Sequence, residues 1–442
     1  MFSRMSAFVF LSLVLPAIAL AQNAIVVENQ QTGSPPSEWD ISGAGDDNIQ
    51  GYATDISVDQ GETVYFKVKT DATDYRLDIY RLGYYNGNGA RKVDTIQPSA
   101  GLPQIQPDCG FEAATNFLDC GNWDVSASWD VPAGAVSGVY FAKLVREDGT
   151  PGESHIVFIV RDDDGGSALL FQTSDTTWQA YNRWGENGVS SGYSLYEPTG
   201  DKADKVSYNR PFGTRDYPIE DWVFNAEYPM IRWIERNGYD VSYFTNVDTD
   251  RYGAEIQEHA VFMSVGHDEY WSRAMRENVT AARDAGVHLA FFSGNEVYWK
   301  VRWEDSTNDP VGNARTLVCY KWPDRTRDPL YGIDNSRVTV MYAVRPVFWP
   351  ENTTTGVGFR NGGYMNKEGT GTVGQYTVYR TDHWAFAGTG LHDGDRFEYE
   401  TELAIEVDGA LFEWQGGLPV VTGERCTASF KRMYGFLLNS HQ

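Results

Sequence analysis

Residues 260–295 read AVFMSVGHDEYWSRAMRENVTAARDAGVHLAFFSGN, and this stretch decides the fold. Residues 260–265 form an apolar run, which is typical of a strand buried on both faces, and residues 287–292 form a second one. Between the runs, Ser272 can cap a helix, apolar residues recur at helical spacing, and Gly286 can close the helix. The pattern predicts two buried, parallel strands joined by a helix.

Polar side chains follow each of the two predicted strands. His267 and Glu269 come after the first strand, and Asn295 comes after the second. Parallel strands joined by a helix end at the same edge of a sheet, where open α/β folds bind ligands. We therefore expect His267, Glu269 and Asn295 to face one cleft. The competing structural interpretation is that His267 and Asp268 cap the following helix while Glu269 complements its dipole.

Length, charge and the first residues restrict the class of protein. A chain of 442 residues is too long for one ordinary core, so two domains are expected. Residues 1–21 contain an early arginine, an apolar stretch and a final Ala-Leu-Ala, which predicts a secretory signal peptide cleaved after Ala21. The mature protein is then expected to be secreted or periplasmic, without a membrane anchor. A formal net charge of −25 repels phosphate backbones and argues against a nucleic-acid partner.

The positions of the four cysteines favour a disulfide over a metal site. Cys109 and Cys120 lie close together in a loop containing Gly and Asn, and an exported chain meets oxidising conditions, so we expect a local disulfide. Whether Cys319 and Cys426 pair stays open, because spacing alone does not fix connectivity. None of the four has the spacing of zinc ligands.

Residues 22–162 contain short alternating segments separated by turn residues. This arrangement predicts an antiparallel β-sandwich of immunoglobulin-like type. In the segment ETVYFKVKT, Phe66 and Val68 are expected to point inward, while Lys67 is expected to point to water.

A charged and then flexible stretch at residues 162–166 predicts a domain boundary. Residues 166–442 begin with alternating strands and helices, which predicts an α/β domain with a mainly parallel, doubly wound sheet. After Asn295 the alternation fades into added β segments, and residues 429–439 are expected to form a last amphipathic helix. The predicted fold class is therefore multidomain, β followed by α/β.

The residues at the predicted sheet edge can carry proton transfer and metal binding. His267 can take or give a proton near neutral pH, and Glu269 is either a proton carrier or an anionic ligand. Asn295 could hydrogen-bond an oxyanion, although an asparagine that holds a tight turn is the simpler interpretation of that residue alone. Phenolate and carboxylate are hard oxygen donors, so Tyr181 or Tyr196 with Glu269 could hold a ferric ion.

Several blocks resemble the large (beta) subunit of N,N-dimethylformamidase, over roughly residues 40–415. They are TWQAYNRWG at 177–185, SLY at 194–196, ERNGYDVSY at 235–243, SVGHDEYWS at 264–272 and FFSGNEVYWKVR at 291–302. The resemblance implies an amidohydrolase that acts on linear C–N amide bonds and splits N-alkyl formamides into formate and an amine. It also implies a mononuclear iron held by two tyrosines and a glutamate, and a glutamine-amidotransferase-like α/β domain.

Carried over onto this sequence, the resemblance implies a metal-binding set and a catalytic or pocket set. The implied iron ligands are Glu269, Tyr181 and Tyr196. The implied catalytic or pocket residues are His267, Asn295, Lys321 and Glu406. In such a site His267 would move the proton and Asn295 would steady the oxyanion.

The chain departs from the family in its export signal, its shorter length and the missing small subunit. A homo-oligomer or a small accessory subunit is therefore an open expectation, and so is the identity of the small amide substrate. Since a fold does not fix a reaction, an alternative stays open at this point. It is a noncatalytic exported protein that keeps the scaffold and binds a glycan or protein ligand through its sandwich and aromatic loops.

Overall fold

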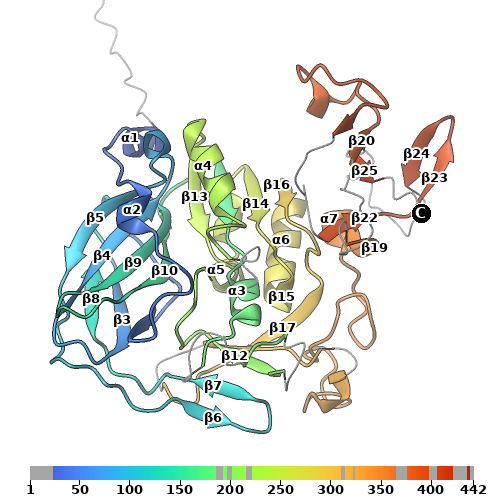
Figure 1. Cartoon of the computed structure of the whole chain (residues 1–442). Coiled ribbons are helices and arrows are strands. Elements are labelled where there is room, and N and C mark those ends of the chain that lie inside the picture. Colours follow the sequence, from blue (N-terminus) through green and yellow to red (C-terminus); the bar gives the residue numbers. More distant parts are fainter. Residues whose placement is uncertain are drawn as a thin grey trace, which may run out of the picture.

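The computed structural model is mostly β, with several sheets and short helices (Figure 1). It describes residues 23–185, 193–196, 202–215, 222–309, 314–321, 324–364, 376–397, 406–421 and 436–438. No helix in these ranges combines the length and the hydrophobicity that a bilayer crossing needs.

Two sheets packed face to face form the N-terminal part. One sheet has the order β2 (Ser57–Val58), β10 (Glu153–Val160), β9 (Gly138–Arg146), β4 (Tyr75–Leu82) and β5 (Ala90–Ile96). The other has the order β1 (Ile49–Ala53), β3 (Thr63–Thr70) and β8 (Ala127–Asp130). Side chains from both sheets, including Phe66, Leu77 and Phe158, share one apolar core. Two short helices, α1 (Ala24–Asn29) and α2 (Pro36–Trp39), precede the sheets.

The expected orientation of Lys67 is wrong, although Phe66 and Val68 are buried as predicted. Lys67 is only 7% exposed, and its Nζ donates to the Gly121 carbonyl at 2.8 Å. Asp309 lies 3.6 Å from the same ammonium. The outer face of β3 is therefore covered at Lys67 by segments that are distant in sequence, and the alternation of side chains could not reveal this cover.

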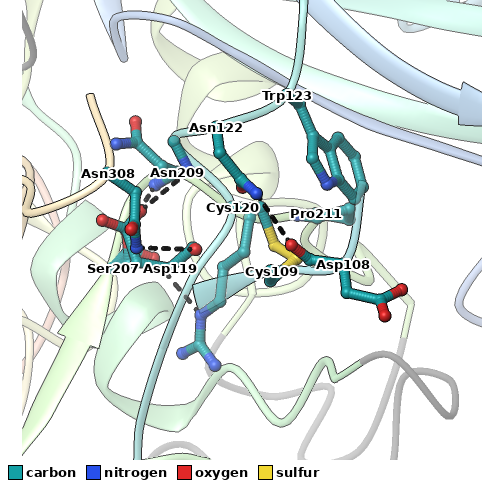
Figure 2. The surroundings of a disulfide bond; sticks show 12 residues. Asp108, Cys109, Asp119, Cys120, Asn122, Trp123, Ser207, Asn209, Pro211 and Asn308 are labelled. Atoms are coloured by element: carbon teal, nitrogen blue, oxygen red, sulfur yellow. Dashed lines mark hydrogen bonds between the residues drawn. A yellow bond between two sulfur atoms is a disulfide. The ribbon is translucent and has the colours of Figure 1, made fainter. Parts of the chain in front are cut away.

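The predicted disulfide between Cys109 and Cys120 is present (Figure 2). It closes a hairpin made of β6 (Gly110–Glu112) and β7 (Phe117–Asp119). Cys319 is a buried free thiol, and Cys426 lies outside the described residues.

A parallel sheet lies beside the sandwich (Figure 1). Its order is β13 (Val241–Phe244), β11 (Leu169–Gln172), β14 (Val261–Val265) and β16 (His288–Phe292). The helices associated with it are α3 (Asp175–Tyr181), α4 (Tyr228–Arg236), α5 (Asn246–Arg251) and α6 (Arg273–Ala285). Helix α6 joins β14 to β16 as the sequence predicts: the Ser272 hydroxyl accepts from the Met275 N–H, and Gly286 ends the helix with a φ of 112°.

The expectation that residues 287–292 are buried on both faces is wrong. Strand β16 is the last in its sheet among the described strands, so it has a neighbour on one side only. Its residues are partly or fully exposed, and Phe292 is 52% exposed. An apolar run shows that a strand forms, but its place in the strand order decides how much of it is covered.

A second sheet continues directly from the polar turn after β14. Its order is β12 (Lys205–Ser207), β18 (Thr316–Val318), β17 (Trp299–Glu304) and β15 (Tyr270–Ser272). Strands β15 and β17 are parallel, and Tyr270 is paired with Trp299. Because β15 begins immediately after Glu269, this pairing places Glu269 beside the start of β17.

The C-terminal part consists of small added β elements. They are β19 (Gly358–Tyr364) with β22 (Glu406–Gly409), β20 (Tyr376–Val378) with β21 (Arg396–Phe397) and β25 (Phe436–Leu438), and the hairpin of β23 (Phe412–Gln415) and β24 (Leu418–Val421). The predicted helix at 429–439 is wrong for residues 436–438, which pair with β20 as a strand. The remaining residues of that predicted helix lie outside the described ranges.

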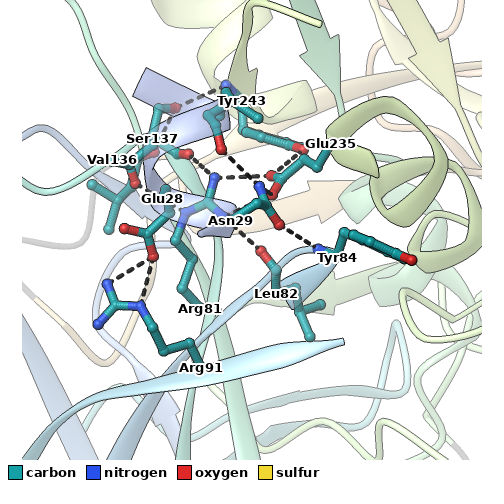
Figure 3. A network of polar contacts seen from close by, with 12 residues as sticks. Glu28, Asn29, Arg81, Leu82, Tyr84, Arg91, Val136, Ser137, Glu235 and Tyr243 are labelled. Carbon is teal, nitrogen blue, oxygen red and sulfur yellow. Dashed lines mark hydrogen bonds and ion pairs between the residues drawn. The ribbon is translucent and has the colours of Figure 1, made fainter. Parts of the chain in front are cut away.

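A buried ion pair joins the sandwich to the parallel sheet (Figure 3). Arg81 on β4 donates to both carboxylate oxygens of Glu235 on α4, at 2.8 and 2.9 Å, and both side chains are fully buried. Asn29 and Tyr243 each donate to the same carboxylate at 2.8 Å. The Glu235 carboxylate therefore accepts hydrogen bonds from residues of α1, β4 and β13. These bonds offset the free energy that is lost when the two charges are removed from water.

Glu235→Gln should destabilise the protein strongly. The change leaves the Arg81 guanidinium buried without a counter-charge, and breaking such a pair costs about 3–5 kcal/mol of the free energy of unfolding. The control Glu277→Gln removes the partner of Arg273 in an exposed pair, where about 0.5 kcal/mol or less is expected. Urea denaturation followed by tryptophan fluorescence measures both. Equal losses in the two variants would contradict a special role for the Arg81–Glu235 pair.

Candidate functional site

The ends of three neighbouring parallel strands supply the residues of the site. His267 and Glu269 follow β14, Asn295 follows β16, and α3, which ends at Tyr181, follows β11. Gly266 makes the turn at the end of β14 possible. Its φ is 105°, and a Cβ there would lie 2.7 Å from a carboxylate oxygen of Glu227.

The carboxylate of Glu269 is the centre of the site. Glu269 is 4% exposed, and four side chains surround its two oxygens. Oε1 accepts from Asn295 Nδ2 at 3.1 Å and from Trp299 Nε1 at 2.8 Å. Oε2 accepts from the Tyr181 hydroxyl at 3.0 Å and lies 3.4 Å from Nε2 of His267. The structure thus brings His267, Glu269, Asn295 and Tyr181 together.

Glu269 is held in its ionised form. Burial acts to raise its pKa, but the hydrogen bond with His267, the charge of Lys321 and the Tyr181 hydroxyl outweigh burial. The pKa of Glu269 therefore lies below its ordinary value of 4.5. A negative charge is maintained at this point at neutral pH.

His267 is oriented so that one ring nitrogen faces the carboxylate. Nδ1 lies 3.0 Å from the Gly294 carbonyl oxygen, which can only accept, so Nδ1 carries the hydrogen. Nε2 then points toward Glu269, where it can accept a proton and hold it against the negative charge. The imidazole has the position that a proton carrier needs.

Lys321 lies within a group of aromatic rings. Its Nζ is 4.8 Å from the ring centre of Tyr270, 5.0 Å from that of Tyr196, 5.1 Å from that of Trp299 and 5.9 Å from that of Tyr181. It also donates a hydrogen bond to the Tyr270 hydroxyl. The rings of Tyr181 and Tyr196 are 5.4 Å apart, and Tyr196 is 52% exposed. The structure therefore places the rings of both predicted tyrosines near the Lys321 ammonium group.

The buried guanidinium of Arg210 holds the main chain near Tyr181 and Tyr196 by hydrogen bonds. Arg210 donates to five main-chain carbonyl oxygens, and these belong to Gln179, Asn182, Trp184, Tyr193 and Ser207. The disulfide-closed hairpin packs on the same segment through the ring contact of Phe111 with Tyr193 at 5.7 Å. Trp123, just after the hairpin, contacts Trp184 at 6.0 Å. A sandwich element therefore supports the tyrosine-bearing part of the site.

The helix-capping interpretation of His267 and Asp268 is wrong. Ser272 caps α6, and strand β15 separates that helix from the polar turn. Asp268 instead points into the protein, where it accepts from Asn246 at 2.9 Å and from Ser264 at 2.7 Å. Burial raises the pKa of Asp268 to about 6.

Two more buried carboxyl groups lie behind the site. Burial raises the pKa of Glu227 to about 8, although Ser174 N and Trp178 Nε1 each donate to it at 3.0 Å. Burial also raises the pKa of Glu296 well above its ordinary value, and Ser264 donates to that carboxyl at 3.0 Å. These groups are favoured in their neutral form.

Sequence reasoning missed Trp299 as a partner of Glu269. The only signal for it was its place in the EVYWKVR block, since the pairing of β15 with β17 cannot be read from periodicity. Glu406 begins β22, and its side chain lies outside the described part of the structure. Among the described residues, no three His, Cys, Asp or Glu side chains gather as metal ligands would.

Comparisons with known proteins point to one family. The family described as N,N-dimethylformamidase beta subunit-like, C-terminal, matches residues 76–429, which include most of the sandwich and the whole parallel sheet. A search of curated proteins gave no match. Among solved structures, a cycloisomaltooligosaccharide glucanotransferase from Paenibacillus sp., complexed with cycloisomaltoheptaose, is 10% identical, with a TM-score of 0.15. The match covers 63% of this chain and 35% of that chain, and so weak a likeness carries no argument.

Glu227→Gln should weaken the pH dependence of stability. Folded Glu227 keeps its proton up to about pH 8, whereas the unfolded chain loses it near pH 4.5. Between these values the unfolded state binds fewer protons, so the free energy of unfolding falls as pH rises, by at most about 1.4 kcal/mol per pH unit from this group. Thermal midpoints at pH 5 and pH 8 should differ less in the variant than in the wild type. Parallel pH profiles would contradict a protonated Glu227.

Proposed function

Because the chain belongs to the N,N-dimethylformamidase beta subunit-like family, we propose that it is an amidohydrolase. Its reaction would cleave the linear C–N bond of a small N-substituted amide, formamide-like, to give a carboxylate and an amine. The observation that carries the proposal is the single buried oxygen, Glu269 Oε2, that faces both the Tyr181 hydroxyl and the His267 imidazole. A buried charge flanked by two proton-carrying groups is typical of a catalytic site.

The residues supply what amide hydrolysis requires. In its neutral form, with Nδ1–H donated to Gly294, His267 can take a proton from the attacking water at Nε2. The imidazolium so formed is stabilised by Glu269 until it gives the proton to the leaving amine. The amide nitrogen of Asn295 carries two hydrogens, and one is donated to Glu269. The second can be donated to the substrate oxygen as negative charge develops there. Lys321 and Glu406 are proposed as polar residues of the pocket.

The oxygen donors fit a hard cation such as ferric iron. Tyr181 Oη and Glu269 Oε2 lie 3.0 Å apart, and the ring of Tyr196 lies 5.4 Å from that of Tyr181. A deprotonated tyrosine beside this carboxylate would place two anions in contact, which a trivalent cation stabilises. We therefore propose Glu269, Tyr181 and Tyr196 as ligands of one iron. Bound iron would act as a Lewis acid toward the amide carbonyl.

The proposal extends to architecture and location. The sandwich at 22–162 would be of immunoglobulin-like type, and the α/β domain at 166–442 would be doubly wound and glutamine-amidotransferase-like. Residues 1–21 would direct export to the periplasm or the medium. The enzyme would act on a small molecule, without a nucleic-acid partner, as a homo-oligomer or with a small accessory subunit.

Iron analysis with two alanine variants tests the function. The purified protein should contain stoichiometric iron and be coloured, because ferric phenolate absorbs visible light. Glu269→Ala should lose the iron. His267→Ala should keep it and lose about 10²–10⁴ of the rate of formamide hydrolysis, the size of a general acid–base contribution. The control is His288→Ala, an exposed residue of β16 that should change neither property.

Two results would oppose the proposal in different ways. A colourless, iron-free protein that stays inactive with ferrous and ferric salts would rule out the iron-dependent hydrolase. Full iron retention in Glu269→Ala would refute the ligand assignment while leaving hydrolysis open.

A further inference from the structure

The two oxygens of the Glu269 carboxylate have chemically different surroundings. Oε1 faces two nitrogen donors, Asn295 Nδ2 at 3.1 Å and Trp299 Nε1 at 2.8 Å. Oε2 faces the Tyr181 hydroxyl at 3.0 Å and the His267 imidazole at 3.4 Å. Oε1 is thus contacted by two nitrogen donors, whereas Oε2 is contacted by a phenolic hydroxyl and an imidazole nitrogen.

Trp299 holds Glu269 at two points. Its main-chain N–H donates to the Glu269 carbonyl at 2.8 Å, within the pairing of β15 with β17, while its indole N–H donates to Oε1. An indole nitrogen is a donor only, so it cannot reverse its role as an amide group can by flipping. Trp299 is buried, with 9% of its surface exposed.

We infer that Trp299 is a positioning residue that selects the working oxygen of Glu269. Together with Asn295 it occupies both lone pairs of Oε1, and Oε2 alone remains for the chemistry that Tyr181 and His267 share. This inference rests on the proposed function and deepens it: the carboxylate binds the metal through one oxygen, Oε2. Removing the indole donor leaves Oε1 with Asn295 as its one remaining donor and frees one lone pair, so that the carboxylate can bind the metal through both oxygens.

Trp299→Phe removes the N–H donor and keeps a smaller aromatic ring, and a control with the same loss of ring volume separates the two effects. The matched control is Trp303→Phe on the same strand, where the ring packs on Tyr208 at 5.5 Å. Affinity for ferric iron, measured by competition with a chelator, should fall about 10–100-fold in Trp299→Phe, the usual effect of losing a hydrogen-bond partner of a metal ligand. The absorption band should shift in the same variant. Trp303→Phe should match the wild type in both respects.

A merely structural role of Trp299 predicts a different result. In that case Trp299→Phe would lower the thermal midpoint of the iron-free protein while leaving the iron affinity and the absorption band unchanged. That outcome would overturn the inference.

The indole N–H signal in nitrogen-15 NMR gives a second test, which does not need an active enzyme. In the iron-free protein the Trp299 signal, identified by its absence from Trp299→Phe, should lie downfield and move upfield in Glu269→Ala. With gallium(III) as a diamagnetic substitute for ferric iron, the signal should stay downfield, because Oε2 takes the metal. An upfield shift on gallium binding would mean that Oε1 is a ligand, and the inference would fail.

The two proposals fail in distinguishable ways. If the wild type takes up neither iron nor gallium, the proposed function fails, and the iron-free spectra still decide the role of Trp299. In that case an indole signal that does not respond to Glu269→Ala would overturn the inference, and an upfield shift would support it.

Discussion

The site depends on keeping one carboxylate charged inside the protein. An ionised group at 4% exposure is stable only when hydrogen-bond donors replace water, and Glu269 meets this need with side chains from separate elements. Tyr181 comes from the end of α3, Asn295 from the turn after β16, and Trp299 from the first position of β17. The buried charge therefore depends on the strand order of two sheets, which brings these donors together.

The sandwich takes part in the same arrangement. The Arg81–Glu235 pair joins β4 to α4, and the disulfide-closed hairpin packs on the segment that Arg210 holds by its carbonyl groups. That segment carries Tyr181 and Tyr196. The geometry of the tyrosines consequently depends on residues from both parts of the chain, which agrees with a family match that begins inside the sandwich, at residue 76.

Features that depend on nearby residues could be predicted from the sequence. The helix at Arg273–Ala285 was specified by Ser272 and Gly286 at its ends, and the disulfide by the short spacing of its cysteines. Features that depend on residues distant in sequence, or on the order of strands in a sheet, could not be predicted. Lys67 is buried by Gly121 and Asp309, which lie far away in sequence, and β16 is exposed because of its place in the strand order. Trp299 was missed for the same reason.

The polar turn at residues 267–269 shows how the structure separates capping from chemistry. In the sequence, three polar residues just ahead of a helix have a sufficient structural explanation. In the structure Ser272 caps the helix, and strand β15 lies between the helix and the turn. His267 and Glu269 are then left with no role in starting the helix, yet the protein keeps them nearly buried beside each other. Even a well-paired buried charge adds little to stability, because desolvation offsets the attraction, so stability alone does not account for this arrangement. A buried charge beside an imidazole is typical of a functional site.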